Sequence, residues 1–182
     1  EDFYIGGARN DYGALFIQNK NGFFINQKPG GSLNLNSASL ESDQMGVLFF
    51  DADNDQDQDL YIATGGSELD INADGYRDHL FINDGKGNFN EDQDALPLIK
   101  QSGSSVVAAD YDQDGDLDLF VAGRVAPGRY PASPKSSLLQ NNSKNGQVIF
   151  NDVTENVAPG LTACGMETSS LWTDTNNDGW FD

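Results

Sequence analysis

Residues 106–121 read VVAADYDQDGDLDLFV, two apolar runs joined by a loop in which every second residue is aspartate. The runs are rich in residues that favour short strands. Gly115 is the residue type that adopts a positive φ without strain, as a sharp turn requires. The stretch therefore predicts a strand, a tight acidic loop and a second strand. The acidic positions of the loop are Asp110, Asp112, Asp114, Asp116 and Asp118.

This pattern is repeated along the chain. Residues 51–59 read DADNDQDQD and residues 174–182 read DTNNDGWFD, so the shared form is D-x-[DN]-x-D-G-x-x-D. The first copy has Gln56 in the glycine position, where a left-handed backbone costs about 1–2 kcal/mol and would weaken or distort the loop. The last loop aspartate recurs at intervals of 59 and 64 residues, at Asp59, Asp118 and Asp182. Self-similarity at such a spacing indicates a repeat architecture.

Each unit reads as four short strands. First strands, which precede the acidic loops, are expected at 47–50, 106–109 and 168–173. The second strand leaves the loop, as at 60–64, and a hairpin at 79–91 with the turn Asp84-Gly85-Lys86-Gly87 supplies the other two. Four antiparallel strands per repeat are typical of a propeller blade, whereas a β-sandwich does not repeat its sequence at this period.

We therefore expect an all-β fold, a β-propeller segment of about three four-stranded antiparallel blades. The approximate units are residues 1–45, 46–102 and 103–164, with 165–182 as the start of the next. A closed propeller usually has about 4 to 8 blades, so the chain is expected to be a segment of a longer protein. Open blade edges recruit other strands, which predicts homo-oligomers that form through these edges.

The composition excludes several kinds of partner. Asp and Glu number 29 against 10 Lys and Arg, a formal net charge of −19. Phosphate binding needs clustered basic residues, so nucleic acid is not expected as a partner. No apolar run is long enough for membrane insertion. One cysteine and one histidine exclude an internal disulfide and a zinc site of the Cys/His type.

The acidic loops predict bound calcium. Ca²⁺ takes roughly 6–8 oxygen ligands, and alternate residues of a tight loop can all point inward. Positions one, three, five and nine would give side-chain oxygens, and position seven its backbone carbonyl. The alternative is an Asx-rich turn without metal, which three copies of closely spaced, repelling carboxylates disfavour. The expected ligands are Asp51, Asp53, Asp55, Asp57, Asp59, Asp110, Asp112, Asp114, Asp116, Asp118, Asp174, Asn176, Asp178, Trp180 and Asp182.

Four other features of the sequence have both a structural and a functional interpretation. Asp70–Asp78 also fits the loop formula, but it lies between second and third strands, where an Asx-rich connection explains it as well. His79 could be a ligand or a base, but no Ser or Cys nucleophile lies in a recognisable frame near it, so a structural or surface histidine is expected. Cys164 is expected as a small buried residue, with a reactive thiol as the alternative. The Pro-containing stretch 124–134 is expected as a long exposed loop that could carry recognition.

The loops and their flanking strands resemble the FG-GAP/VCBS repeat family, which includes the calcium-binding blades of integrin α-chain propellers and bacterial relatives of the cartilage acidic protein group. The resemblance covers nearly the whole chain and rests on residues 105–121 and 47–62, while 130–142 and 150–154 resemble the cartilage-acidic type of repeat. It implies calcium between the first two strands of each blade, an extracellular or cell-envelope location and an interaction role. Gln56 departs from the family pattern.

Three functions remain open at this point. The first, which we expect, is a secreted calcium-binding module for adhesion or another interaction with a protein or glycan ligand, without catalytic residues. The second is a lyase-like carbohydrate-active propeller enzyme, which would need a basic residue over a groove, and only 10 Lys and Arg are available. The third is a purely structural scaffold.

Overall fold

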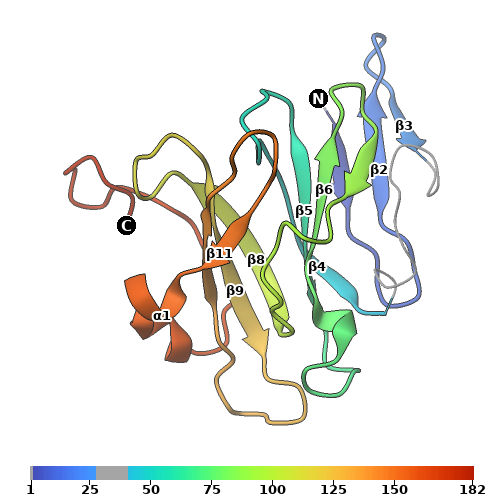
Figure 1. Ribbon diagram of the computed structural model, residues 1–182. Coiled ribbons are helices and arrows are strands. Elements are labelled where there is room, and N and C mark those ends of the chain that lie inside the picture. Colours follow the sequence, from blue (N-terminus) through green and yellow to red (C-terminus); the bar gives the residue numbers. More distant parts are fainter. Residues whose placement is uncertain (1, 28–40) are drawn as a thin grey trace.

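Three antiparallel sheets stand side by side in the structure, a computed structural model that describes residues 2–27 and 41–182 (Figure 1). Their strand orders are β1-β2-β3, β4-β5-β6-β7 and β8-β9-β10-β11, so each strand pairs with its neighbours in the sequence. The fold is all-β and propeller-like, as predicted. The second and third sheets have four strands, and the first has three within the described residues.

The strand bounds follow the apolar runs of the sequence. In chain order the strands are β1 (Phe3–Ile5), β2 (Ala14–Gln18), β3 (Phe24–Gln27), β4 (Asp43–Phe50), β5 (Asp59–Gly65), β6 (His79–Asn83), β7 (Phe89–Glu91), β8 (Ser102–Ala109), β9 (Asp118–Val125), β10 (Ser137–Asn141) and β11 (Phe150–Asp152). The helices described are short connections, η2 (Asp74–Tyr76), α1 (Thr154–Val157) and η3 (Pro159–Ala163). None of these is long and apolar enough to cross a membrane.

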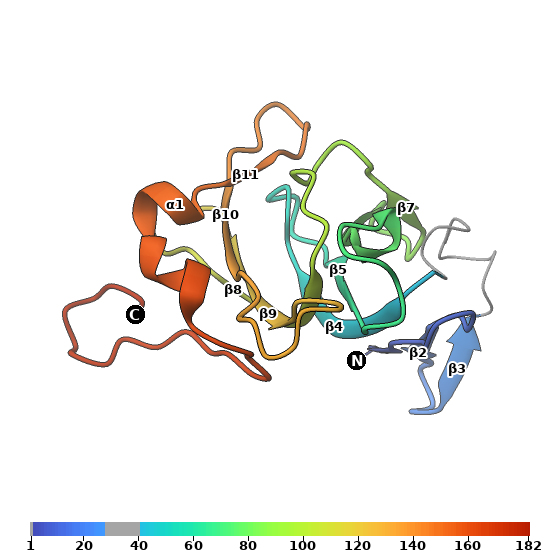
Figure 2. The same ribbon diagram turned by 90° about the horizontal axis from the view of Figure 1, so that it is seen from below.

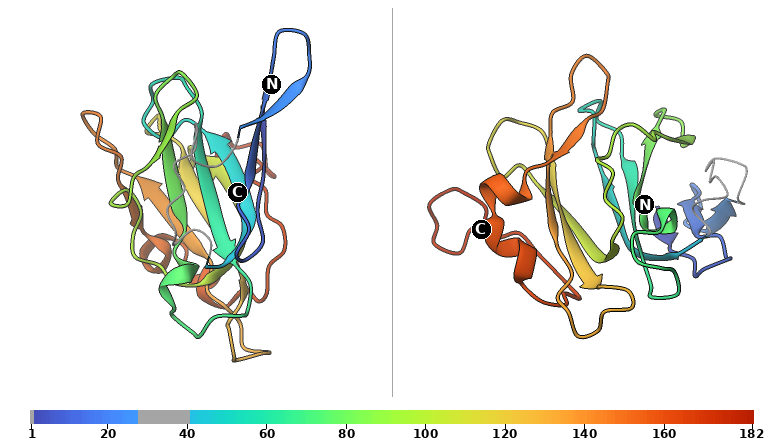
Figure 3. Two further views of the ribbon diagram at one scale, coloured as in Figure 1. Left: turned by 90° about the vertical axis from the view of Figure 1, so that its right-hand side faces the viewer. Right: turned by 60° about the horizontal axis from the view of Figure 1, so that its bottom comes forward.

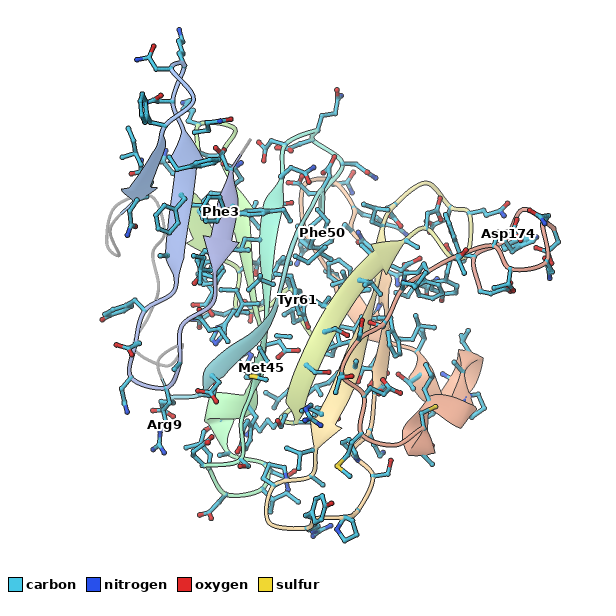
Figure 4. All side chains as sticks on the ribbon, turned by 180° about the vertical axis from the view of Figure 1, so that it is seen from behind. Phe3, Arg9, Met45, Phe50, Tyr61 and Asp174 are labelled. Atoms are coloured by element: carbon cyan, nitrogen blue, oxygen red, sulfur yellow. The ribbon has the colours of Figure 1, made fainter. Side chains whose placement is uncertain are left out.

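The core lies between the sheets. Every residue of β5 is buried, because successive side chains of a strand point to opposite faces and both faces of this strand are covered. Leu60 and Ile62 belong to the apolar cluster shared with the first sheet, and Tyr61 and Ala63 to the cluster shared with the third. Figure 4 shows Tyr61 in the space between its own sheet and the third one. This two-sided burial explains the continuous apolar runs.

The sheets approach each other most closely at small residues of their first strands. A Cβ at Gly46 of β4 would lie 2.4 Å from the backbone oxygen of Ser104 in β8, so no larger residue fits there. The second and third sheets spread apart from β4 and β8 toward β7 and β11 (Figure 2). Close inner strands and separated outer strands are the arrangement of propeller blades.

The expected strand at residues 168–173 does not form, so this prediction was wrong. The ladders β4–β5 and β8–β9 both begin with a residue pair that closes the acidic loop, Phe50 with Asp59 and Ala109 with Asp118. Thr173 and Asp182 make the same pair through two backbone bonds, but the ladder does not extend beyond it. The segment is held instead against the third sheet, where Ser170 Oγ lies 2.8 Å from Ser105 Oγ.

Candidate metal centre

The three acidic loops lie at one end of the sheets, which we call the loop face. Residues 51–59 and 110–118 connect the first two strands of the second and third sheets, and 174–182 occupies the corresponding place after the third (Figure 1). In Figure 4, Asp174 marks the loop face and Arg9 lies at the opposite end. The connections 66–78 and 126–136 form that far face (Figure 3). The fold therefore separates the acidic loops from the other long connections.

All three loops are closed by the same hydrogen bonds from backbone amides to aspartate carboxylates. The carboxylate at position one accepts N–H groups from positions five and six, as Asp110 does from Asp114 and Gly115, both at 3.1 Å. Asp51 and Asp174 repeat this arrangement. Carboxylates that accept such bonds order a turn without any metal. The repeat in the sequence is therefore a repeat in backbone geometry.

The backbone of each loop needs a left-handed conformation at position six. Gly115 and Gly179 have φ of 101° and 89°, and Gln56 follows the same path with φ of 77°. Asn or Gln at position four is left-handed in all three loops as well. The first loop therefore keeps the shape of the other two, and its departure from glycine shows as backbone strain at Gln56.

Gln56→Gly should stabilise the protein and tighten metal binding at the first loop. The left-handed conformation costs a side-chain-bearing residue about 1–2 kcal/mol, and the larger unfolded-state entropy of glycine offsets about 0.5–1 kcal/mol of that. We expect a net gain of up to about 1 kcal/mol in urea unfolding. Gly115→Gln is the reciprocal change and should destabilise by a similar amount. A destabilised Gln56→Gly variant would show that the glutamine side chain has another role.

The folded loops bring three carboxylates together at two places. One oxygen each from Asp51, Asp53 and Asp59 lies within 4.8 Å of the others. Asp110, Asp112 and Asp118 form the same group in the next loop. These are positions one, three and nine of the predicted ligand set. The residues at positions five and seven lie outside these groups, as does the third loop.

The aspartate at position nine is the most buried residue of each group. Asp59 and Asp118 are both fully inaccessible to solvent. Asp118 accepts N–H bonds from Tyr111 in its loop at 3.2 Å and from Asn141 in β10 at 2.8 Å. Asp59 makes the equivalent bonds with Ala52 and Asn83. This carboxylate thus ties the loop to the third strand of the blade as well as facing the possible metal position.

Burial and crowding disturb the ionisation of these groups. Burial raises the pKa of Asp59 to about 7 and that of Asp118 to about 6, although the backbone bonds partly oppose the shift. Burial, followed by the neighbouring Asp114, raises the pKa of Asp116 to about 7. Burial and the neighbouring carboxylates both disfavour the ionised form, which a bound cation would favour.

The second loop contains oxygen atoms of the kind that a divalent cation binds. Asp112 Oδ1 and Asp116 Oδ1 are buried and have no hydrogen-bond partner within the described residues, and Asp57 Oδ1 is in the same state in the first loop. The three ion pairs in the described part of the chain all lie outside the acidic loops. Unpartnered hard oxygens beside clustered carboxylates are the donor set that Ca²⁺ uses.

Asparagines at the end of the third strand also shape the centre, although they are not among the predicted ligands. The Asn141 amide donates to Leu117 O in its own loop at 3.3 Å and to Ala52 O in the loop of the preceding blade at 3.0 Å. In the second blade, the Asn83 amide donates to Gln58 O, which corresponds to the bond from Asn141 to Leu117 O. The sequence does mark these residues, because asparagine recurs as the last residue of β6 and of β10.

The fourth match, Asp70–Asp78, does not form a loop of this kind. The Asp78 carboxylate accepts bonds from Tyr61 Oη at 2.7 Å and Thr64 N at 2.8 Å, inside the second sheet. Asp74 points elsewhere and pairs with Lys100 at 2.5 Å. The connecting-turn interpretation therefore describes this stretch, and the carboxylates of Asp74 and Asp78 are occupied by other partners.

Asp78 should make the metal-free protein less stable as the pH rises from about 4 to about 6. Burial raises its pKa to about 6, against the lowering effect of Thr64, Tyr61 and His79. The folded chain then holds the proton more tightly than the unfolded chain, so folding loses free energy as that proton is released. In chelator, the Asp78→Asn variant should show a smaller loss of melting temperature across this range. Equal pH slopes in the two proteins would contradict the assignment.

The two remaining candidates have different surroundings. His79 is buried, and its Nδ1 lies 2.6 Å from Glu91 Oε1 on the neighbouring strand, as a structural histidine would. Cys164 is exposed at the end of η3, so the prediction of burial was wrong. The reason is local, because η3 contributes no buried residue to the core.

The fold and the loops define an acidic repeat protein of the propeller type. Residues 70–121, which include the whole acidic loop 110–118, match the FG-GAP-like repeat. The chain therefore contains an FG-GAP-like repeat, and the resemblance to FG-GAP repeats is confirmed over these residues. A search of the curated proteins gave no match.

Proposed function

We propose that this chain is part of an extracellular, calcium-stabilised β-propeller module that binds a protein or glycan partner and is not an enzyme. The observation that carries the proposal is the repetition of one carboxylate geometry, at Asp51, Asp53 and Asp59 and again at Asp110, Asp112 and Asp118. A turn formed without a metal has no need to hold three carboxylates this close, because like charges repel. VCBS repeats and integrin α-chain blades are the parallels that this proposal follows.

Calcium would neutralise these loops and join neighbouring blades. Positions one, three and nine of the first two loops would hold the ion, whose positive charge would offset the repulsion between their carboxylates. The first loop contacts the third blade through Asn141, and Gln113 Nε2 of the second loop donates to Gly179 O of the third loop at 2.8 Å. An ion in one loop therefore restrains a row of connected loops. A site of moderate affinity suits extracellular calcium, since extracellular modules bind at about 10⁻⁴–10⁻³ M.

Calorimetric titration of the metal-free chain with CaCl₂ tests this proposal. We expect at least two ions per chain, one for each carboxylate group, with dissociation constants of about 10⁻⁴–10⁻³ M. MgCl₂ should bind more weakly, because Mg²⁺ loses its water reluctantly and demands octahedral geometry. Absence of calcium binding, or equal binding of the two ions, would count against a calcium module.

A further inference from the structure

A groove on the far face separates the second and third blades. Its volume is about 500 Å³, within the range of ligand sites. One wall comes from the second blade, including Ile71 and residues 98–101, and the other from the third, including residues 125–127, Arg129 and residues 133–137. A second hollow of about 410 Å³ shares Ile71, Pro127 and Arg129 with it. Both walls belong to blades with four strands, so the groove is formed by complete parts of the fold.

Basic side chains are concentrated in this groove. The chain has 10 Lys and Arg in all, and three of them, Lys100, Arg129 and Lys135, line this one hollow. Among the described residues, the Arg129 guanidinium has no ion-pair or hydrogen-bond partner. The groove lining also contains Asp152 and Glu155, and the adjoining hollow contains Glu68 and Asp70. Arg129 therefore supplies the unpaired positive charge of the groove, and the two lysines contribute only where their acidic partners are displaced.

The acidic residues nearby leave this charge available. Lys100 pairs with Asp74 and Lys135 with Glu155 at 3.5 Å, and the two acidic side chains are 84% and 78% exposed. Exposed pairs of this kind contribute little free energy and exchange easily. The Asp152 carboxylate in the groove lining accepts bonds from Thr154 N and Oγ1. A ligand carboxylate can therefore replace Asp74 and Glu155 without leaving a buried charge unpaired.

Apolar side chains beside the charges indicate what kind of anion fits. Leu98 is 69% exposed and Ile71 is 40% exposed, and both line the groove together with Val125 and Pro127. Carbohydrate sites use flat aromatic faces, and the groove lining contains no aromatic residue among the described ones. Alternating carboxylate and aliphatic groups, as a peptide carries, match this surface better than a sugar does.

We infer that this groove binds an acidic peptide segment of a partner protein, with carboxylates at Arg129, Lys100 and Lys135 and aliphatic side chains against Leu98 and Ile71. The inference rests on the proposed interaction role and specifies its partner chemistry. It also places the binding surface on the far face, away from the acidic loops, where the same peptide would be repelled.

Fluorescence anisotropy with defined probes tests the inference. The probe is a short fluorescein-labelled peptide of alternating Glu and Leu, and its neutral control alternates Gln and Leu. Both are titrated in excess calcium with the whole chain and with Arg129→Glu/Lys135→Glu. The matched control variant is Lys20→Glu/Lys86→Glu, which changes the net charge equally but alters the β2–β3 and β6–β7 turns. All substituted residues are exposed, and circular dichroism confirms folding of each variant.

We expect the groove variant to weaken binding of the Glu/Leu peptide by about tenfold or more, and the control variant by less than about twofold. Binding should also weaken as ionic strength rises from about 0.01 M to about 0.15 M. The inference is overturned if the two variants behave alike, if the Gln/Leu peptide binds equally, or if no Glu/Leu peptide binds. It is also overturned if oligogalacturonate binds, or is cleaved to an unsaturated product, in place of the peptide.

Calcium calorimetry on the same samples separates this inference from the proposed function. Calcium binding with unchanged peptide affinity in the groove variant would refute the groove alone. Peptide binding that depends on the groove, without any calcium binding, would refute the calcium module and leave the groove standing.

Discussion

Asp112→Ala is expected to lower the melting temperature in calcium and to leave it nearly unchanged in chelator. Asp112 contributes one of the three clustered carboxylate oxygens of the second loop, and its Oδ1 is buried without a partner. Calcium at a hundredfold excess over its dissociation constant stabilises the folded state by about 2.7 kcal/mol. Loss of that site should therefore cost roughly 5–10 °C in a chain of this length.

Differential scanning calorimetry in excess CaCl₂ and in chelator measures the effect of Asp112→Ala. Asp94→Ala is the control, because Asp94 is an exposed turn residue outside the acidic loops. It should shift the melting temperature little in either condition. An equal loss for Asp112→Ala with and without calcium would mean that the residue stabilises the loop by itself, and the metal assignment would be wrong.

Asp118→Ala is expected to destabilise the protein strongly in both conditions. Its carboxylate is fully buried and accepts N–H bonds from the loop and from β10, so the alanine leaves two buried donors without a partner. Hydrogen bonds to charged groups contribute about 1.5–3 kcal/mol each. Part of this lost free energy is offset, because the alanine variant no longer buries a charge. Burial of that charge raises the pKa of Asp118 to about 6. We expect a net loss of about 2–4 kcal/mol in chelator.

Asp182→Ala is the matched control for Asp118→Ala. Asp182 has the same place in its loop, but it is exposed, and within the described residues its carboxylate accepts hydrogen bonds from Thr175 alone. Urea unfolding in chelator should show a loss of less than about 1 kcal/mol for this variant. Similar losses for the two alanine variants would refute the idea that position nine acts as a tie between strands.

The strand–loop–strand units could be read from the sequence because their pattern depends on local physical constraints. The backbone has few other conformations when alternate aspartates and a left-handed residue are followed by an apolar run. The structure accordingly has strands at 43–50 and 59–65. The gathering of positions one, three and nine follows from that geometry. Local pattern was insufficient at 168–173, because a strand also needs a partner to pair with.

Two other features could not be predicted, for different reasons. The recurrence of asparagine marks the residue itself, but the bond of Asn141 to Ala52, 89 positions away in the preceding blade, has no signature in local spacing. The groove is formed by connections that differ between units, 66–78 in one blade and 126–136 in the next. Because these connections differ in sequence between units, a comparison of the repeats does not reveal the groove. Pairing of two chains through open blade edges stays a prediction.

The two-sided burial of β5 constrains how such a protein can change its length during evolution. Tyr61 in β5 and Phe120 in β9 occupy the same strand position, and Tyr61 packs against the next sheet while Phe120 contacts Trp172. Each blade therefore offers one kind of face to the blade before it and another to the blade after it. Duplication or loss of a whole blade preserves these matched faces. A gain or loss of part of a blade exposes a strand whose two faces are both apolar. Selection should remove such variants.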